Sequence, residues 1–262
     1  MATVYIAPTA QGSANGTSEA DAYAYTSLSS AESDAGSGGT IFFIDGDYSL
    51  GANQAWDSSG VTYKSLNRFG AKIIGTTSVR VLTIGTTTNS VAVTVSGFSF
   101  QDFVFKFTPP SSSSIVQTLE YSKATQTMSS GSNPISGQSG SGDRAVVNFC
   151  ALNFKPSGTS FGNSTSNYIY KNSSFFFDLS ATTGITPDSS VISNNCIYSS
   201  NDSSKWSQAL ASSGTNCCFH NMGTANSSGG TNNIFVDPVY VDPGTDLRLR
   251  PTSPCINAGT VS

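Results

Sequence analysis

Short apolar segments recur along the chain at a nearly constant interval. In the second half each segment follows an asparagine, and these markers stand 22 to 24 residues apart, at Asn148, Asn172, Asn194 and Asn216. Each marker opens a short run rich in Phe, Ile, Leu, Tyr and Cys, which Ser, Gly or Asn then interrupts. Runs of this length are typical of β-strands. The pattern predicts an all-β solenoid whose coils bury their apolar sides by stacking on one another.

The first forty residues predict a cap for the open end of this stack. Thr26–Ala35 has the pattern of a short helix, because a hydroxyl residue begins it and Gly36 follows its end. A solenoid needs such a cover because its first coil otherwise exposes apolar core and unpaired strand edges. We therefore expect a single domain over residues 1–262, divided into an N-terminal cap (1–40), coils (41–234) and a C-terminal closing segment (235–262).

Two stretches depart from the regular pattern. Phe98–Phe107 holds five phenylalanines, which fit inside one coil if a turn near Gln101–Asp102 divides them. Ser122–Gly142 is rich in Ser and Gly and has almost no apolar residue. We expect this second stretch to protrude from the stack as a loop.

Charge is scarce along the chain. Of the 262 residues, 11% are charged, and the formal net charge is −4. This balance provides no basic surface for nucleic acid. No apolar run is long enough for a membrane helix, so we expect no membrane insertion. The sequence begins at Met1 without the basic and apolar regions of a secretory signal, which predicts synthesis in the cytoplasm.

The five cysteines fit the repeat better than a metal site. Cys150, Cys196 and either Cys217 or Cys218 fall at similar points of successive coils. We interpret them as reduced thiols stacked in the core, where Cys packs as a small apolar residue. The chain has no pair of C-x-x-C motifs and no histidines at zinc spacing. We assign no metal ligand and no cofactor.

No residue stands out as catalytic. The 16 acidic residues are scattered, and those beside glycine or proline, such as Asp45, Asp47 and Asp237, have the pattern of turn formers. Cleavage of a sugar bond needs two carboxylates that face each other, and no such pair can be identified. The single histidine, His220, has no serine or aspartate at triad-like positions near it in the sequence.

The segment Tyr168-Ile-Tyr170-Lys171 is the candidate binding surface. Alternation along a strand places both tyrosines on one face and the lysine on the other. Two interpretations stay open: the tyrosines line the core, or they form an exposed aromatic platform. An exposed platform would suit a sugar ring or a neighbouring subunit, so Tyr168, Tyr170 and Lys171 are the candidate glycan or subunit interface.

Both ends of the chain carry a resemblance to a known group. The N-terminal runs Val4–Pro8 and Gly39–Tyr48, together with the C-terminal runs Phe235–Gly244 and Ser253–Gly259, resemble the opening and closing sequences of right-handed parallel β-helix proteins of the pectate-lyase-like group. The resemblance implies that fold for nearly the whole chain. It implies little about activity, because such β-helices include lyases, hydrolases, adhesins and viral spikes.

The motifs of the enzymes in this group are missing. The polygalacturonases are similar to one another in adjacent aspartates, an Asn-Thr-Asp, a Gly-x-His and an Arg-x-Lys, and none of these occurs here. The calcium-binding carboxylates and tryptophan-rich strands of the pectate lyases are also absent. Whether the protein is an enzyme stays open, and these absences favour a role without catalysis.

The sequence therefore supports three functional hypotheses. The first is a non-enzymatic bacteriophage virion surface protein, a capsid decoration or a tail spike or fibre component, for structural packing or host-surface attachment. Its expected partners are two further copies in a homotrimer, other virion proteins, or a host cell-surface glycan. The second is a polysaccharide lyase or glycoside hydrolase with an unrecognised site. The third is a bacterial secreted carbohydrate-binding module, which would place the protein outside the cell rather than on a virion assembled in the host cytoplasm.

Overall fold

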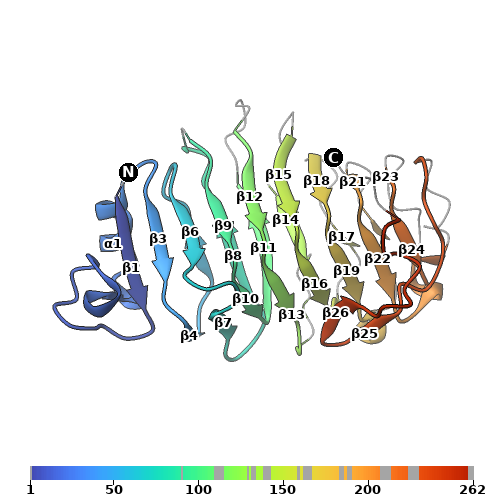
Figure 1. Ribbon diagram of the computed structural model, residues 1–262, viewed down its shortest axis with the longest axis horizontal. Coiled ribbons are helices and arrows are strands. Elements are labelled where there is room, and N and C mark those ends of the chain that lie inside the picture. Colours follow the sequence, from blue (N-terminus) through green and yellow to red (C-terminus); the bar gives the residue numbers. More distant parts are fainter. Residues whose placement is uncertain are drawn as a thin grey trace.

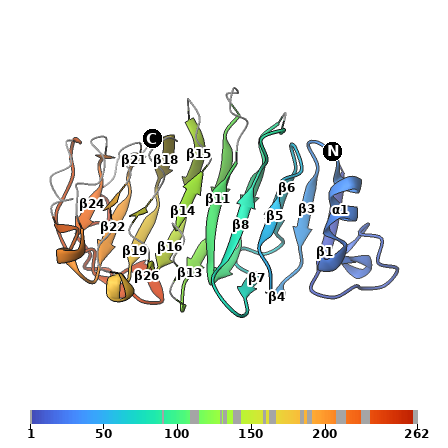
Figure 2. The same cartoon turned by 180° about the vertical axis from the view of Figure 1, so that it is seen from behind.

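The chain forms a right-handed parallel β-helix (Figure 1). This computed structural model describes residues 2–89, 91–108, 115–128, 130, 134–137, 143–157, 160–161, 167–182, 186–187, 191–206, 214–223 and 230–258. Successive strands lie side by side along the length of the molecule, from the N-terminal cap at one end to the last coils at the other, and the view from behind shows the same order (Figure 2). The all-β solenoid predicted from the repeat and the parallel β-helix implied by the resemblance are both confirmed.

Three parallel sheets make up the sides of the described stack. Sheet A has ten strands, in the order β2 (Tyr23–Ala24), β1 (Thr3–Ala7), β3 (Thr40–Phe43), β6 (Thr62–Ser65), β9 (Thr94–Ser96), β12 (Gln117–Glu120), β15 (Asp143–Asn148), β18 (Asn167–Lys171), β21 (Val191–Asn194) and β23 (Gly214–Thr215). Sheet B has eight, from β4 (Gly46–Leu50) through β7 (Ala71–Gly75), β10 (Ser99–Gln101), β13 (Lys123–Thr125), β16 (Ala151–Phe154), β19 (Ser174–Phe177) and β22 (Ile197–Ser200) to β24 (Cys218–His220). Sheet C has four: β5 (Gln54–Trp56), β8 (Arg80–Ile84), β11 (Phe103–Phe107) and β14 (Ile135–Gly137).

The remaining elements are short. The β17 strand (Ser160–Phe161) pairs with β20 (Thr186–Pro187), and β25 (Tyr240–Asp242) forms an antiparallel hairpin with β26 (Asp246–Leu249). The helices are α1 (Leu28–Ala35) and the 3-10 turns η1 (Glu19–Asp21), η2 (Tyr25–Ser27), η3 (Leu179–Ala181) and η4 (Ser203–Lys205). No helix in the described part of the chain is long and apolar enough to cross a membrane.

The core is a continuous stack of inward side chains from Val4 to Met222. It includes all five phenylalanines between Phe98 and Phe107, which are buried as expected. Asp102 turns the chain between β10 and β11 with a φ of +57°, so the turn predicted near Gln101–Asp102 is present. Its buried carboxylate accepts backbone N–H bonds from Thr127 and Met128 at 2.7 and 2.9 Å, which fixes the chain of the next coil.

The N-terminal cap matches its prediction. The α1 helix ends before Gly36, which has a φ of +60°, and it buries Ala31 and Ala35 against the first strands. The cap also contributes to the sheet, because β1 pairs in parallel with β3. The cap is therefore continuous with the coils.

The prediction that Ser122–Gly142 protrudes as a loop is wrong for those of its residues that the structure describes. This stretch supplies β13 to sheet B and β14 to sheet C, and so forms part of a coil. Ala124 and Ile135 are buried, and the buried Gln126 donates to the Phe103 carbonyl and accepts from the Lys155 N–H. The strand was missed in the sequence because its inward side chains include the small Ala124 and the hydrogen-bonded amide of Gln126, where other coils have large apolar residues.

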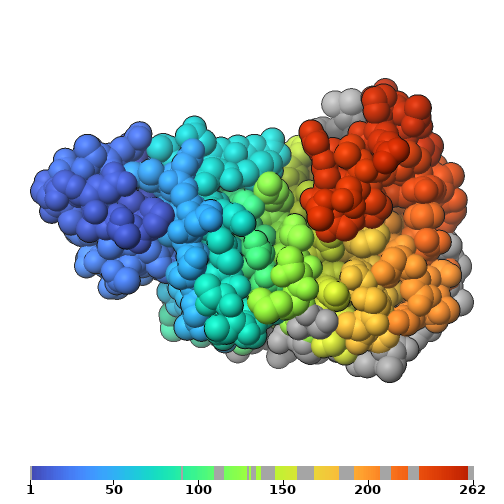
Figure 3. Space-filling view, turned by 90° about the horizontal axis from the view of Figure 1, so that it is seen from below, coloured from blue at the N-terminus to red at the C-terminus, as the bar shows by residue number. Residues whose placement is uncertain are grey.

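The closing segment does not extend the stack. After β24, Thr231 and Ile234 still pair in parallel with Thr215 and Cys218. Beyond them the chain turns back along the stack, and the space-filling view shows the last residues, coloured red, lying over earlier parts of the chain (Figure 3). Asn153 on β16 holds the turn of the β25–β26 hairpin through Nδ2, which donates to the carbonyls of Pro243 and Gly244. The hairpin thereby becomes a wall raised above sheet B.

Candidate functional site: a groove beside an aromatic corner

One residue per coil turns the chain from sheet A to sheet B in a left-handed conformation. We call this line of residues the corner: Phe69, Gly97, Tyr121, Phe149, Asn172, Asn195 and Asn216, with φ between +48° and +84°. Each backbone N–H donates to a carbonyl of the next coil, as from Tyr121 to Asn148 at 3.1 Å. The sequence markers Asn148 and Asn194 instead end strands of sheet A one residue earlier, so the predicted register was off by one at these two coils.

The C-terminal half of the corner is an asparagine ladder. Asn172 Nδ2 donates to Asn148 Oδ1 at 3.1 Å, and Asn195 Nδ2 donates to Asn172 Oδ1 at 3.2 Å. Asparagine tolerates positive φ better than other residues with a side chain, because its short amide bonds locally. This half is explained by stability alone.

The N-terminal half carries large aromatic side chains in the same backbone conformation. Phe69, Tyr121 and Phe149 have φ of +67°, +49° and +52°. Tyr121 and Phe149 are 40% and 44% exposed, and their rings stack at 5.1 Å with 5° between the planes. A bulky residue at positive φ is strained by about 1 to 2 kcal/mol. The stack between the two rings is of similar size to that strain, and about two fifths of each residue stays exposed to solvent.

A guanidinium completes the aromatic line where Gly97 has no side chain. Arg68 lies 4.8 Å from the Phe69 ring centroid and 5.7 Å from the Tyr121 centroid, so it bridges the two aromatic residues on either side of Gly97. Lys123 Nζ lies 5.1 Å from the Phe69 centroid. Both contacts are within the range of cation–π attraction.

Arg68 and Phe69, at one end of this aromatic line, border a groove of about 600 Å³ on the outer face of sheet B, whereas Tyr121 and Phe149 are not among its lining residues. Lys123 and Thr125 on β13 and Asn153 on β16 form its floor, Arg68 and Phe69 form one wall, and the hairpin residues Thr245–Arg248 form the other. The groove exists because the closing segment folds back over sheet B.

The groove carries uncompensated positive charge. Asp246, the single carboxylate among the described lining residues, forms a bidentate pair with Arg248 at 2.6 to 2.9 Å. Hydrogen bonds from Arg248 lower the pKa of Asp246 to about 2, so the two charges cancel at neutral pH. No described carboxylate forms an ion pair with Arg68 or Lys123, and both side chains are exposed. Anions are therefore favoured here.

A second cavity, of about 350 Å³, lies under the closing segment. His220 Nδ1 is 4.0 Å from Asp237 Oδ1, and Ser199 pairs in register with His220 on the adjacent strand. The sequence did not predict this cluster, because the fold-back of the closing segment brings Asp237 to His220. Ser199 is buried and its Oγ donates to the Phe175 carbonyl at 3.4 Å, so this hydroxyl is turned to the backbone. Among the described residues of this cavity, the Ser199 hydroxyl therefore makes no nucleophile–base hydrogen bond with His220.

Of the two interpretations of Tyr168 and Tyr170, the structure supports the one in which both tyrosines line the core. Alternation along β18 is as expected, with Tyr168 and Tyr170 on one face and Lys171 exposed on the other. Both tyrosines, however, are fully buried, and Tyr170 packs against Phe175 at 5.0 Å. The inward face of the strand takes the rings because it is the apolar side of the coil. Lys171 faces solvent on sheet A, away from the groove.

The positions of the cysteines agree with the prediction of thiols stacked in the core, and they show that Cys217, not Cys218, is the residue that matches Cys196. Cys150, Cys196 and Cys217 each follow a corner residue and are buried in the core. Cys218 is the residue on the outer side of sheet B. All five cysteines are free, and the described residues include no cluster of three or more His, Cys, Asp or Glu suited to a metal.

Sequence reasoning missed the aromatic line because Phe149 reads as the first residue of an apolar strand. The signal was the immediate neighbour: Phe149 precedes the inward Cys150 just as Asn172 precedes Ser173 and Asn195 precedes Cys196. Aligning the coils on their inward residues places Tyr121 and Phe149 at the corner.

Comparisons with known proteins give a structural resemblance and no match in sequence. No protein-family model matches the sequence, and no curated protein matches it either. Among solved structures, the chain is similar to pectin methylesterase PemA from Erwinia chrysanthemi at 10% identity, over 83% of this chain and 77% of that chain, with a TM-score of 0.49.

Proposed function

We propose that this protein is a non-enzymatic β-helix that binds an acidic glycan in the groove and attaches a bacteriophage particle to its host surface. The observation that carries the proposal is the aromatic half of the corner. Phe69, which lines the positively charged groove, holds a strained backbone conformation, and so do Tyr121 and Phe149 further along the corner. Strain that packing does not require is typical of binding sites, where it fixes side chains in place before the ligand arrives.

The chemistry of the groove fits an anionic sugar. Phe69, the aromatic residue that lines the groove, offers its ring to the C–H face of a pyranose, and the partly exposed rings of Tyr121 and Phe149 continue the aromatic line beyond the groove. Arg68 and Lys123 pair with a carboxylate, sulfate or phosphate on the same sugar. Thr125 adds a hydroxyl group for the sugar hydroxyls.

The same charges argue against glycan cleavage. A general acid needs a pKa raised toward neutrality, whereas Arg248 lowers that of Asp246 to about 2. No second carboxylate lines the groove among the described residues, so the pair of acids required for hydrolysis is missing there.

Binding to a panel of neutral and acidic glycans, followed by titration calorimetry on the best ligand, tests the proposal. We expect acidic glycans to bind, and Arg68→Ala and Lys123→Ala each to weaken binding at least about tenfold, or about 1.4 kcal/mol. Lys171→Ala is the matched control, because it removes an exposed lysine on the opposite sheet. Equal weakening by Lys171→Ala, or binding of neutral glycans only, would contradict the assignment of the groove.

The virion location and the homotrimer are part of the same proposal. The outer face of sheet A supports lateral packing, since Val146, Ile169 and Ile192 lie side by side on three coils and Ile192 is 36% exposed. The centres of protein–protein interfaces are likewise poor in charged residues. Light scattering should give a trimer that Ile169→Lys dissociates, and mass spectrometry of purified particles should detect the chain. A monomer absent from particles would favour the secreted carbohydrate-binding module.

Hydrolysis is the second candidate function, and the His220–Asp237 contact is what favours it. Approach of a ligand could turn the Ser199 hydroxyl from the Phe175 carbonyl toward His220. Release of reducing ends, unsaturated ends or ester-derived acid from the glycan panel would reveal it. Turnover that His220→Ala abolishes would replace the non-enzymatic proposal, whereas no turnover leaves the groove as a binding site.

A further inference from the structure

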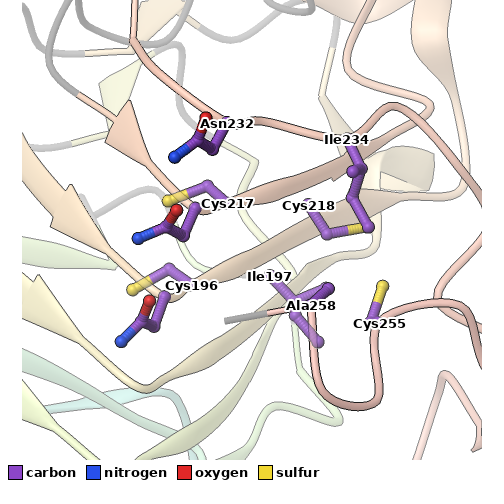
Figure 4. A pocket seen from close by; sticks show the side chains of 10 residues that line it. Cys196, Ile197, Cys217, Cys218, Asn232, Ile234, Cys255 and Ala258 are labelled. Atoms are coloured by element: carbon purple, nitrogen blue, oxygen red, sulfur yellow. The ribbon is translucent and has the colours of Figure 1, made fainter. Parts of the chain in front are cut away.

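The closing segment rests on sheet B through a pair of cysteines. Cys218 lies on the outer side of β24, and the chain around Ser253–Ala258 passes over it. Cys255 and Cys218 line one small cavity, and Figure 4 shows the Cys255 sulfur turned toward Cys218. The remaining cysteines of this cavity, Cys196 and Cys217, point into the core on the other side of the sheet. The two pairs are therefore separated by the strands themselves.

We propose that Cys218 and Cys255 are a disulfide site that fastens the closing segment to the last coil once the protein meets a disulfide oxidant. The site goes beyond the glycan-binding proposal and does not depend on it. Its structural effect is to fix the segment that carries the hairpin wall of the groove.

The reaction needs an external disulfide, such as oxidised glutathione. The Cys255 thiolate attacks one sulfur of that molecule, forms a mixed disulfide and releases one glutathione thiolate. Cys218 then attacks the Cys255 sulfur and releases the second, and each leaving thiolate takes up the proton lost by a cysteine. Two protein thiols are oxidised and one glutathione disulfide is reduced to two thiols.

Cys255 is the cysteine that attacks the external disulfide first, because its thiol is the more exposed and the more acidic of the two. Cys255 is partly exposed, whereas Cys218 is 3% exposed beneath it. The hydrogen bond between the two thiols raises the pKa of Cys218 and lowers that of Cys255, so Cys255 ionises first. Cys196 and Cys217 are each 1% exposed inside the core, which keeps the reagent from them in the folded protein.

Counting thiols in denaturant after incubating the folded protein with oxidised glutathione tests the site. The wild type should fall from five thiols to three, since one disulfide consumes two. Cys255→Ser and Cys218→Ser should lose no second thiol to an internal disulfide, whereas Cys196→Ser should still lose two. Five remaining thiols in the wild type, a lasting glutathione adduct, or loss of two thiols from Cys255→Ser to an internal disulfide would overturn the proposal.

Trypsin gives a second readout that does not depend on the variants folding alike. Arg248 is highly exposed, and cleavage after it separates Leu249 and the residues beyond it, including Cys255, from the rest of the chain. In the oxidised protein this fragment should stay attached until a reductant is added. Its release without reductant, in a sample that has lost two thiols, would show that another pair had been oxidised and would also overturn the proposal.

Discussion

The two halves of the corner share a backbone conformation and differ in what it supports. In the C-terminal half, asparagines at Asn172 and Asn195 relieve the cost of positive φ and bond to one another. In the N-terminal half, Tyr121 and Phe149 accept that cost with their rings exposed. The asparagine half shows what this chain uses when only stability matters. The aromatic half therefore identifies the part of the corner selected for another purpose.

The largest expected effect comes from the core that both halves share. Leu152 is fully buried on β16, the strand that follows the corner residue Phe149. Leu152→Asp would bury an unpaired charge, which should destabilise the protein by about 4 kcal/mol or more. Circular dichroism during thermal unfolding should show one early loss of structure. Persistence of the asparagine half after loss of the aromatic half would mean that the two halves fold separately.

A smaller effect should follow from turning the asparagine half into the aromatic one. Asn172→Phe removes the bonds of Asn172 to Asn148 and from Asn195, and it places another ring at positive φ. We expect a loss of about 2 to 3 kcal/mol in unfolding free energy, measured by urea denaturation. Glycan affinity should not rise. A neutral effect on stability would show that the asparagine ladder is dispensable.

The sequence predicted the fold because its signals are local and repeated. Apolar alternation at positions such as Tyr168 and Tyr170, and the helix stop at Gly36, each depend on a few neighbouring residues. The groove depends on distant ones. Arg68 contacts Tyr121 across Gly97. Asp246 and Arg248 reach the groove because the closing segment folds back over sheet B, and the spacing of the strands does not predict that turn. A repeat predicts how coils stack, and it gives no information on where the chain goes after the last coil.

The reverse exchange should separate binding from stability. Tyr121→Asn relieves strain at φ +49° but gives up the stack with Phe149, two effects of similar size, so stability should change by less than about 1 kcal/mol. Glycan affinity should fall about tenfold, because the variant removes part of the flat surface beside Arg68. Calorimetry on the same samples used for urea unfolding measures both. Unchanged affinity would contradict the proposal that the aromatic residues of the corner contribute to glycan binding.

The smallest effect is a pH dependence confined to acid. The pKa of Asp246 in the folded protein is about 2, below its ordinary value of 3.8, because Arg248 donates hydrogen bonds to the carboxylate. The contribution of this pair to stability is therefore fully present above about pH 4 and is lost as the pH falls toward 2. Arg248 is 81% exposed and Asp246 is partly exposed, so salt and solvent screen the pair and the change in unfolding temperature should be slight. Asp246→Asn should abolish that slope between pH 4 and 2 while leaving unfolding at pH 7 nearly unchanged. It should also leave the Arg248 charge unpaired, so an acidic glycan should bind the variant more tightly at pH 7, and weaker binding would mean that the hairpin wall needs the pair to keep its shape.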